Sequence, residues 1–259
     1  MPKEISFSAP RNETAAQAVH ITTPTRAALF ADVEDRLRGG RGFSLATLNL
    51  DHAVKLRRDT AFRAAYLAQD IVVADGNPIV WLSKLAGREI ELIPGSELVA
   101  PLTGLAAALD MPVALLGSTP EALAAAADGL RRAHPAVTIA AQIAPPFGFD
   151  PASEAAADIL RQVDASGARL CFLALGAPKQ EILAARGAEF APACGFVSIG
   201  AGLDFIAGTQ ERAPLWVRKI AMEWAWRMFS NPKRMAARYG ACFAILPDLG
   251  VSALRERKK

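Results

Sequence analysis

A lone carboxylate stands at the end of an apolar run of this sequence: Asp75 follows residues 71–74 and precedes Gly76, Asn77 and Pro78. Withdrawal from water at such a junction raises the pKa of a carboxyl group toward the range of a general base. The same residue can instead cap the helix that Pro78 begins, so a structural interpretation stays open. We predict that Asp75 is a catalytic base and that Asn77 beside it binds substrate.

Three further apolar runs also end in polar or glycine residues. These residues are Thr47 and Asn49, then Gly117 with Ser118 and Thr119, and finally Lys179 with Gln180 and Glu181. A lysine and a glutamine at a helix start can bind an anion through side chains and backbone N–H groups. Asn49 can also be a simple helix cap, and Glu181 can be part of an ion pair. The spacing of a P-loop is missing, so the sequence does not predict a nucleoside triphosphatase.

Residues 198–238 combine a glycine-rich part with a part rich in tryptophan and arginine. Gly200, Gly202 and Gly208 surround Asp204, and glycine lets a backbone approach a ligand closely. Indoles among guanidinium groups suit both phosphate groups and flat apolar surfaces. The residues concerned are Trp216, Trp224, Trp226, Arg212, Arg218, Lys219, Arg227, Lys233, Arg234 and Arg238. A solvated basic helix with an aromatic stripe toward the core would have the same composition, so both interpretations stay open.

Apolar runs alternate with segments of helical periodicity, and these elements must position the polar groups. The predicted strands are residues 43–48, 71–74, 90–93, 112–116, 137–143, 170–175 and 196–199, with a short edge strand at 20–22. The predicted helices include residues 24–38, 54–66, 78–85, 95–110, 120–134, 151–166 and 214–229. Uniformly apolar strands predict an α/β fold, a Rossmann-like and mainly parallel sheet flanked by helices. The polar junctions would then meet at one edge of the sheet.

Composition divides the 259-residue chain into three parts. Residues 1–19 are polar and predicted to be disordered or loosely packed, residues 20–208 form the α/β catalytic domain, and residues 209–259 form a basic helical C-terminal appendage. The last part contains eleven Lys or Arg against four Asp or Glu, whereas the first 208 residues contain eighteen against twenty-two. Such an asymmetry predicts an anionic partner, a phosphate ligand or a lipid surface. The aromatic and basic residues follow no recognised nucleic-acid-reading module, so nucleic acid is not predicted.

The cysteines, Cys171, Cys194 and Cys242, are far apart and lie in apolar surroundings. Their spacing fits neither a metal site nor a disulfide framework, and it is typical of buried thiols in a reducing compartment. We see no signal peptide, and the nearly uncharged stretch 239–247 is too short to span a bilayer. We therefore predict a cytoplasmic protein without cofactor or metal, whose membrane contact is peripheral.

Seven short segments within residues 43–239 form a pattern by their order and spacing. They are 47–49 (Thr-Leu-Asn), 73–78 (Val-Ala-Asp-Gly-Asn-Pro), 145–149 (Pro-Pro-Phe-Gly-Phe), 175–181 (Leu-Gly-Ala-Pro-Lys-Gln-Glu), 204–208 (Asp-Phe-Ile-Ala-Gly), 212–214 (Arg-Ala-Pro) and 223–239. Together these segments resemble the WecG/TagA/CpsF family of glycosyltransferases. The resemblance implies a metal-independent, inverting transfer of a sugar from a UDP-sugar to a polyprenyl-diphosphate-linked acceptor, in cell-surface polysaccharide synthesis at the inner face of the plasma membrane. In well-known members the donor is UDP-N-acetylmannosamine or its uronic acid, and others use glucose or further donors.

The resemblance also assigns roles to individual residues. Asp75 matches the proposed general base, Thr47 and Asn49 match polar contacts near the sugar, and Gln180 matches a pocket residue. The arginines of the C-terminal part match a membrane-associating appendage that closes the site: Arg212, Arg227, Arg234 and Arg238. From their positions in the segments that follow predicted strands we add further substrate-binding residues: Asn77, Gly117, Lys179, Gly200 and Asp204.

This sequence departs from the family pattern in three places. Residues 90–95 are one residue shorter than usual, and Leu92 stands where an arginine is common. Ser198 replaces a usual glycine, and Leu203 replaces a usual phenylalanine before Asp204. These departures bear on the identity of the donor sugar more than on the type of reaction.

We considered two other functions. A nucleotide-dependent oxidoreductase would need a GxGxxG fingerprint after the first strand, and residues 43–49 contain none. A non-catalytic binding module on the membrane would use the basic C-terminal part, in which Met235, Tyr239 and Leu246 accompany basic residues. The aromatic-rich C-terminal part can also join two subunits, so a homo-oligomer is a further expectation.

Overall fold

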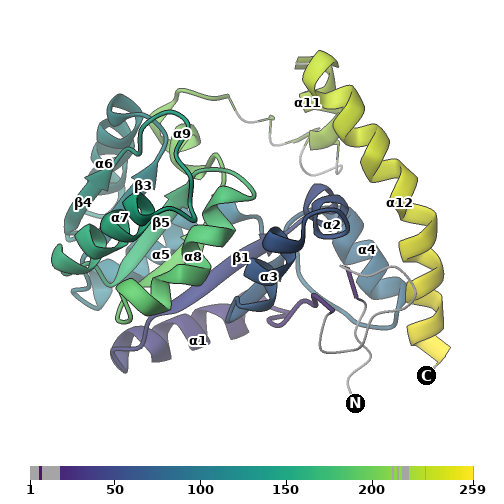
Figure 1. Ribbon diagram of the computed structural model, residues 1–259, viewed down its shortest axis with the longest axis horizontal. Helices are drawn as coiled ribbons and strands as arrows, with labels where there is room; N and C mark the ends of the chain where they lie inside the picture. Colours follow the sequence, from purple (N-terminus) through teal and green to yellow (C-terminus); the bar gives the residue numbers. More distant parts are fainter. Residues whose placement is uncertain are drawn as a thin grey trace.

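Six apolar segments form one parallel sheet in the part of the chain that the structure describes (Figure 1). This computed structural model describes residues 6–7, 18–211, 213–214, 216–217, 222–230 and 232–258, without the side chains of residues 224, 227, 230 and 234. The strands are β1 (Phe43–Leu48), β2 (Ile71–Ala74), β3 (Val113–Gly117), β4 (Ile139–Ile143), β5 (Leu170–Ala174) and β6 (Gly195–Ser198). Their order is β2-β1-β6-β5-β3-β4, and every neighbouring pair is parallel. The predicted Rossmann-like α/β fold is confirmed.

Helices cover both faces of the sheet, which is why strands such as β1 and β6 are buried along their whole length and mainly apolar. One face packs with α1 (Arg26–Arg38), α5 (Val99–Ala108), α6 (Pro120–Ala133) and α9 (Gly202–Ala207). The other face packs with α2 (Leu50–Leu56), α3 (Thr60–Leu67), α4 (Asn77–Leu85), α7 (Glu154–Ala165) and α8 (Lys179–Phe190). Along β1, Phe43 and Leu45 belong to the first side, whereas Ala46 and Leu48 belong to the second. Successive side chains therefore alternate between the two cores.

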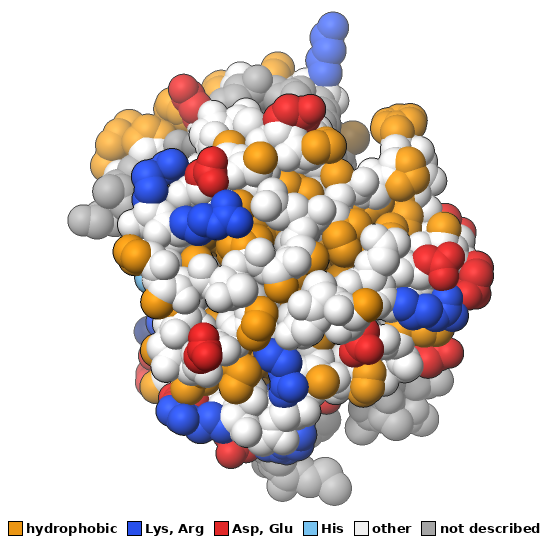
Figure 2. All heavy atoms as spheres, turned by 90° about the vertical axis from the view of Figure 1, so that its left-hand side faces the viewer, with side chains coloured by type: hydrophobic (Ala, Val, Ile, Leu, Met, Phe, Trp, Pro, Cys, Tyr) orange, Lys and Arg blue, Asp and Glu red, His pale blue; other side chains and the backbone are white. Residues whose placement is uncertain are grey.

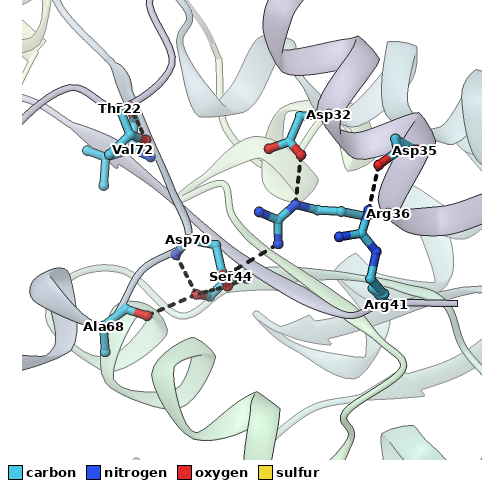
Figure 3. Close-up of polar contacts among 9 residues, drawn as sticks. All are labelled: Thr22, Asp32, Asp35, Arg36, Arg41, Ser44, Ala68, Asp70 and Val72. Atoms are coloured by element: carbon cyan, nitrogen blue, oxygen red, sulfur yellow. Dashed lines mark hydrogen bonds and ion pairs between the residues drawn. The ribbon is translucent and has the colours of Figure 1, made fainter. Parts of the chain in front are cut away.

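Polar contacts hold helix α1 against the amino-terminal ends of β1 and β2 (Figure 3). The carboxylate of Asp70 accepts hydrogen bonds from the backbone N–H and the hydroxyl of Ser44, at 2.9 and 3.1 Å. The guanidinium of Arg36 donates to Asp32 at 2.8 Å and also pairs with Asp70 at 3.5 Å. This cluster fixes the end of the sheet opposite to the one where the predicted site residues lie.

Two helix predictions need correction. Helix α1 begins at Arg26 with Thr25 as its N-cap, two residues after the predicted start at residue 24. The predicted helix 54–66 is two helices, α2 and α3, because Asp59 accepts a hydrogen bond from the N–H of Phe62 and caps a new start. The apolar spacing of this segment predicts one continuous helix, but the cap at Asp59 starts a second one.

Two predicted strands are not strands. Residues 90–93 precede the short 3-10 helix η2 (Gly95–Glu97) and lie beside β2. The backbone N–H of Ile93 donates to the carbonyl of Ala74 in β2, whereas the N–H of Glu91 donates to the carbonyl of Pro24. N–H groups two residues apart point to the same side of a strand, so bonds from Glu91 and Ile93 to different segments do not form a ladder. Residues 20–22 fail for another reason: the hydroxyl of Thr22 accepts the N–H of Val72 at 2.8 Å, where a strand would offer a carbonyl (Figure 3).

The C-terminal helix α12 (Pro232–Lys258) lies along α2 and α4 (Figure 1). Leu249 and Ala253 are buried in the apolar cluster that contains residues of β1 and β2, and Phe7 is buried there too. The guanidinium of Arg57 pairs with Asp248 at 2.9 Å. Part of the predicted appendage and two residues of the predicted loose N-terminal segment, Phe7 and Val19, thus complete the core. The domain boundaries stay predictions.

The preceding helix, α11 (Glu223–Ser230), covers part of the predicted helix 214–229. Residues 216 and 217 are also helical, and residues 218–221 lie outside the described residues. The face of the molecule formed by α6, β4 and α7 shows acidic and basic side chains interspersed (Figure 2). This face lies on the side of the molecule away from α12 (Figure 1), and it shows no excess of basic residues like that of the C-terminal part (Figure 2).

Candidate active site

Most of the predicted site residues lie at one edge of the sheet, where the parallel strands end. Asn49 follows β1, Asp75 follows β2, Gly200 follows β6 and the loop 175–178 follows β5. These four strands are consecutive neighbours in the sheet. The carboxyl edge of an open parallel sheet is where ligands bind in such folds, and the predicted convergence is confirmed at the level of the backbone.

Asp75 and Asn49 occupy adjacent strand ends. The backbone N–H of Asp75 donates to the carbonyl of Leu48 at 2.8 Å, which extends the β1–β2 ladder to this residue. Gly76 follows with φ 118°, and a Cβ atom there would lie 3.9 Å from the Cβ of Asn49. Asp75 is half-buried, and helix α4 has Gly76 as its N-cap, so the acid lies one residue before the cap position.

Asn49 has the capping role that the sequence left open. Its side-chain oxygen accepts a hydrogen bond from the N–H of His52 at 3.0 Å and so caps α2. The amide nitrogen of Asn49 is therefore the part of this side chain that can donate to a ligand. Asn77, the first residue of α4, is half-buried on the neighbouring loop.

Thr47 lies below this edge rather than on it. Its side chain is only 3% exposed, and a Cβ atom on Gly95 would be 3.2 Å from its methyl carbon and 3.0 Å from the carbonyl of Ser198. Glycine at position 95 thus lets the 3-10 helix η2 approach β1 and β6 closely. Thr47 shapes the floor of the candidate site, and its predicted contact with substrate stays a prediction.

A buried pair of ring side chains supports β1 from the other face. The Nδ1 atom of His52 lies 2.7 Å from the Tyr66 hydroxyl, and that hydroxyl donates to the carbonyl of Thr47 at 3.2 Å. Burial lowers the pKa of His52 to about 3, so its imidazole is neutral at physiological pH. Burial and the nearby charges of Glu181 and Asp75 raise the pKa of Tyr66 well above its usual value. The phenol therefore stays protonated and continues to donate.

The start of α8 and the loop after β6 are joined through Gln180. Its amide oxygen accepts the N–H of Gly200 at 3.1 Å, and its amide nitrogen donates to the Glu181 carboxylate at 2.8 Å. Gln180 is 2% exposed, so its amide is largely committed within the protein. Lys179, the first residue of the 12-residue helix α8, is half-buried at the same edge. Its ammonium group and the helix N-terminus can together attract an anion.

Asp204 forms a separate polar cluster at the end of β3. Its carboxylate accepts hydrogen bonds from the hydroxyl of Ser118 at 2.5 Å and from the amide of Gln210 at 3.0 Å. Gly117 adopts φ +117°, and a Cβ atom there would lie 2.4 Å from the carbonyl oxygen of Ala174. Both predicted binding residues thus have structural contacts that account for their residue types, and their contact with substrate stays a prediction.

An ion-pair cluster connects α12 to the candidate site. The Asp51 carboxylate lies 2.8 Å from the ammonium of Lys55 and 3.0 Å from the guanidinium of Arg238. Lys55 also donates to the carbonyl of Ala177, in the loop after β5, at 3.4 Å. Burial opposes the ionisation of Asp51, but Lys55 and Arg238 hold its pKa below the usual value. Arg238 is therefore beside the sheet edge, paired with α2.

Some predicted site residues cannot be placed. Arg212 lies outside the described residues, as do the side chains of Arg227 and Arg234. Sequence reasoning missed Lys55, and it named Ser118 at a strand end without giving it a role. The four-residue spacing of Asp51 and Lys55 on a helix could have indicated the first. Only the folded chain shows the bond between Ser118 and Asp204.

The described residues contain no group of three or more His, Cys, Asp or Glu side chains arranged to hold a metal ion. None of the helices in this part of the chain combines the length and the apolar character that crossing a bilayer requires. Charged side chains discussed at the sheet edge are Asp75, Lys179, Lys55, Asp51, Arg238 and, near the end of β3, Asp204.

A comparison with protein families agrees with the geometry. The sequence model of the family described as "Glycosyl transferase WecG/TagA/CpsF family" matches residues 16–259. The match covers nearly the whole chain, including α12 and the loops at the sheet edge. This protein therefore belongs to the WecG/TagA/CpsF family of glycosyltransferases, which act in cell-surface polysaccharide synthesis.

Proposed function

We propose that this protein transfers a sugar from a UDP-sugar to a polyprenyl-diphosphate-linked acceptor, with inversion and without a metal ion. The observation that supports this proposal most directly is the place of Asp75. It is a half-buried carboxylate at the carboxyl end of β2, beside Asn49 and on the same sheet edge as the start of α8. One base and one anion-binding helix start are what an inverting transfer requires.

The proposed reaction is a single displacement at the anomeric carbon. Asp75 takes the proton of the acceptor hydroxyl as its oxygen bonds to the anomeric carbon, and the bond to UDP breaks on the opposite face. UDP leaves with the electron pair. We assign the stabilisation of its charge to Lys179 and the N-terminus of α8, with arginines of the C-terminal part. In this proposal those arginines are Arg212, Arg227, Arg234 and Arg238.

Donor and acceptor follow from the family resemblance rather than from the geometry. We propose an N-acetylmannosamine-type sugar or a related hexose as the transferred group. A purified-protein assay tests this by offering a panel of UDP-sugars with a synthetic lipid-diphosphate-linked sugar and identifying products by mass spectrometry. Parallel reactions with EDTA and with added Mg²⁺ test the metal requirement. A product that forms only with Mg²⁺, or no transfer from any UDP-sugar, would contradict the proposal.

The role of Asp75 predicts a specific loss. Asp75→Asn keeps the size of the side chain and removes the base, so we expect the turnover rate to fall about 10²- to 10⁴-fold. The melting temperature should stay close to that of the unchanged protein. Asp128→Asn, at an exposed ion pair on α6, is the matched control and should keep full activity. Normal turnover by Asp75→Asn would show that another group accepts the proton.

We further propose that the C-terminal part contacts an anionic membrane at the inner face of the plasma membrane. Large apolar side chains are exposed there, including Trp216, Phe229 and Phe243, and they accompany basic residues. Vesicle sedimentation tests this with a triple variant that changes these residues to serine. We expect its binding to phosphatidylglycerol vesicles to fall at least several-fold. Phe147→Ser changes an exposed aromatic residue in a loop outside the C-terminal part and should bind normally. Equal binding by all three proteins would exclude this surface.

A further inference from the structure

A carboxyl group is completely buried next to the candidate site and has no role in the mechanism above. Glu181 is 0% exposed, in the first turn of α8. One of its oxygens accepts the amide hydrogen of Gln180 at 2.8 Å, and the other has no hydrogen-bond partner among the described residues. Its backbone carbonyl accepts from the side chain of Gln69 at 3.1 Å. The surrounding protein thus fixes this residue on both sides.

Stability alone does not explain a carboxyl group at this position. Withdrawal from water raises the pKa of Glu181 to about 7, against the opposing effects of Gln180 and Lys55. Replacing a buried polar group together with its hydrogen-bond partner by apolar groups of the same shape can be nearly neutral or stabilising. Buried groups with a strongly shifted pKa are frequent at functional sites, which gives a reason to look for a role.

The geometry around Gln180 indicates that role. An amide side chain can rotate by half a turn and exchange its oxygen and nitrogen. When ionised, the Glu181 carboxylate can only accept a hydrogen from Gln180, so it holds the amide nitrogen on its own side. The amide oxygen then points to the N–H of Gly200, which donates to it at 3.1 Å. Two hydrogen bonds in series therefore connect Glu181 to the loop after β6.

We propose that Glu181 is a positioning residue: its buried carboxyl orients the Gln180 amide and thereby holds the Gly200 backbone in the geometry that sugar transfer requires. This inference rests on the proposed function for its catalytic part. Glu181 does not touch substrate, because its side chain is fully enclosed. It acts through Gln180 on the loop that connects β6 to α9 at the carboxyl edge.

Two substitutions separate positioning from simple packing. Glu181→Gln keeps an oxygen that accepts from Gln180, whereas Glu181→Met keeps the volume and removes the acceptor. Glu189→Gln, at an exposed position on the same helix, is the control. In Glu181→Met we expect at least tenfold faster hydrogen exchange at the Gly200 amide, measured by NMR, and at least a tenfold lower kcat/KM. Glu181→Gln should recover most of both quantities.

The melting temperature separates the two roles, because a residue that only packs the core would lower it when substituted. We expect the melting temperature of Glu181→Met to stay close to that of the unchanged protein, because relief from burying a carboxyl group offsets the loss of its hydrogen bond to Gln180. Its activity should nevertheless be lower. Unchanged Gly200 exchange in Glu181→Met would overturn the inference, and so would an activity loss matched by an equal loss of stability. If the unchanged protein transfers no sugar, the proposed function fails. Gly200 exchange, which needs no substrate, still decides in that case whether Glu181 orients Gln180.

Discussion

His52 shows how burial determines the chemistry of a single side chain. Its ring is enclosed beside the rings of Phe62 and Tyr66, with centroids 5.6 and 5.9 Å away. A positive charge in these surroundings would lose its hydration without gaining a partner of opposite charge in direct contact. His52 is therefore a neutral hydrogen-bonding group that supports β1 through Tyr66. Its protonation at low pH should lower the stability of the folded protein.

Protonation of His52 predicts a loss of stability in acid. Its pKa is about 3 in the folded chain and 6.5 as the reference value, so protons bind more tightly to the unfolded chain. The contribution to stability is complete above pH 6.5 and is lost as the pH falls toward 3. By pH 4.5 the loss amounts to roughly 3 kcal/mol. Melting curves between pH 7 and pH 4.5 measure it.

The matched variants are His52→Gln, which cannot take up a proton, and His134→Gln at a partly exposed position. The first should lose clearly less stability than the unchanged protein between pH 7 and pH 4.5. The second should follow the unchanged protein. Identical pH dependence of all three proteins would show that His52 is not the group responsible.

At the scale of elements, the sequence predicts the sheet and its site edge but not the contacts between distant loops. Uniformly apolar runs locate all six strands, and Asp75 is predicted at a strand end for the same reason. The bond between Ser118 and Asp204 joins residues 86 positions apart. Its formation depends on strand order, which apolar runs do not specify. The sequence likewise predicts Gln180 as a ligand contact. The hydrogen bonds of its side-chain amide could not be predicted, because they depend on where β6 ends.

Local chemistry accounts for the wrong element predictions. Residues 90–93 have the apolar character of a strand, but their N–H groups bond to two different segments. The break between α2 and α3 is encoded in Asp59, a cap residue that the apolar periodicity of the segment conceals. A side chain that bonds a nearby backbone group can end or start a helix in the folded chain, but its presence in a sequence only weakly predicts that it will do so.

The turn after β3 predicts a strong dependence on glycine. Gly117→Ala would place a Cβ atom 2.4 Å from the carbonyl of Ala174, at φ +117°. We expect a loss of about 3 kcal/mol or more, because backbone displacement adds to the conformational strain. Gly148→Ala has a positive φ as well, 80°, but an open environment, and should cost about 1 kcal/mol. Calorimetric melting of both variants measures the difference, and equal losses would disprove a steric role for Gly117.

At the scale of the molecule, α12 belongs partly to the site and partly to the core. Near its start Arg238 pairs with Asp51, close to the loops at the sheet edge. Toward its end Leu249 and Ala253 are buried in the cluster that covers β1 and β2. The helix therefore connects the place of proposed catalysis to the stability of the whole α/β unit.

This double role predicts that a substitution near the C-terminus affects global stability. Leu249→Ala removes a fully buried side chain, and we expect a loss of about 2–5 kcal/mol in the unfolding of the whole chain. Leu254→Ala, at an exposed position of the same helix, should cost little. Chemical denaturation followed by circular dichroism compares the two. A stability of Leu249→Ala equal to that of the unchanged protein would make α12 an independent appendage.

The hydroxyl of Thr22 occupies a backbone group along one border of the sheet. Strand β2 is at one end of the sheet, where unpaired backbone groups normally invite a further strand. Here the N–H of Val72 is taken by that hydroxyl, its carbonyl accepts the N–H groups of Thr22 and Thr23, and the carbonyl of Ala74 accepts Ile93. A second chain therefore finds these groups already occupied. Edge-to-edge sheet extension, a common start of aggregation, is blocked along this border by one threonine and two short loops.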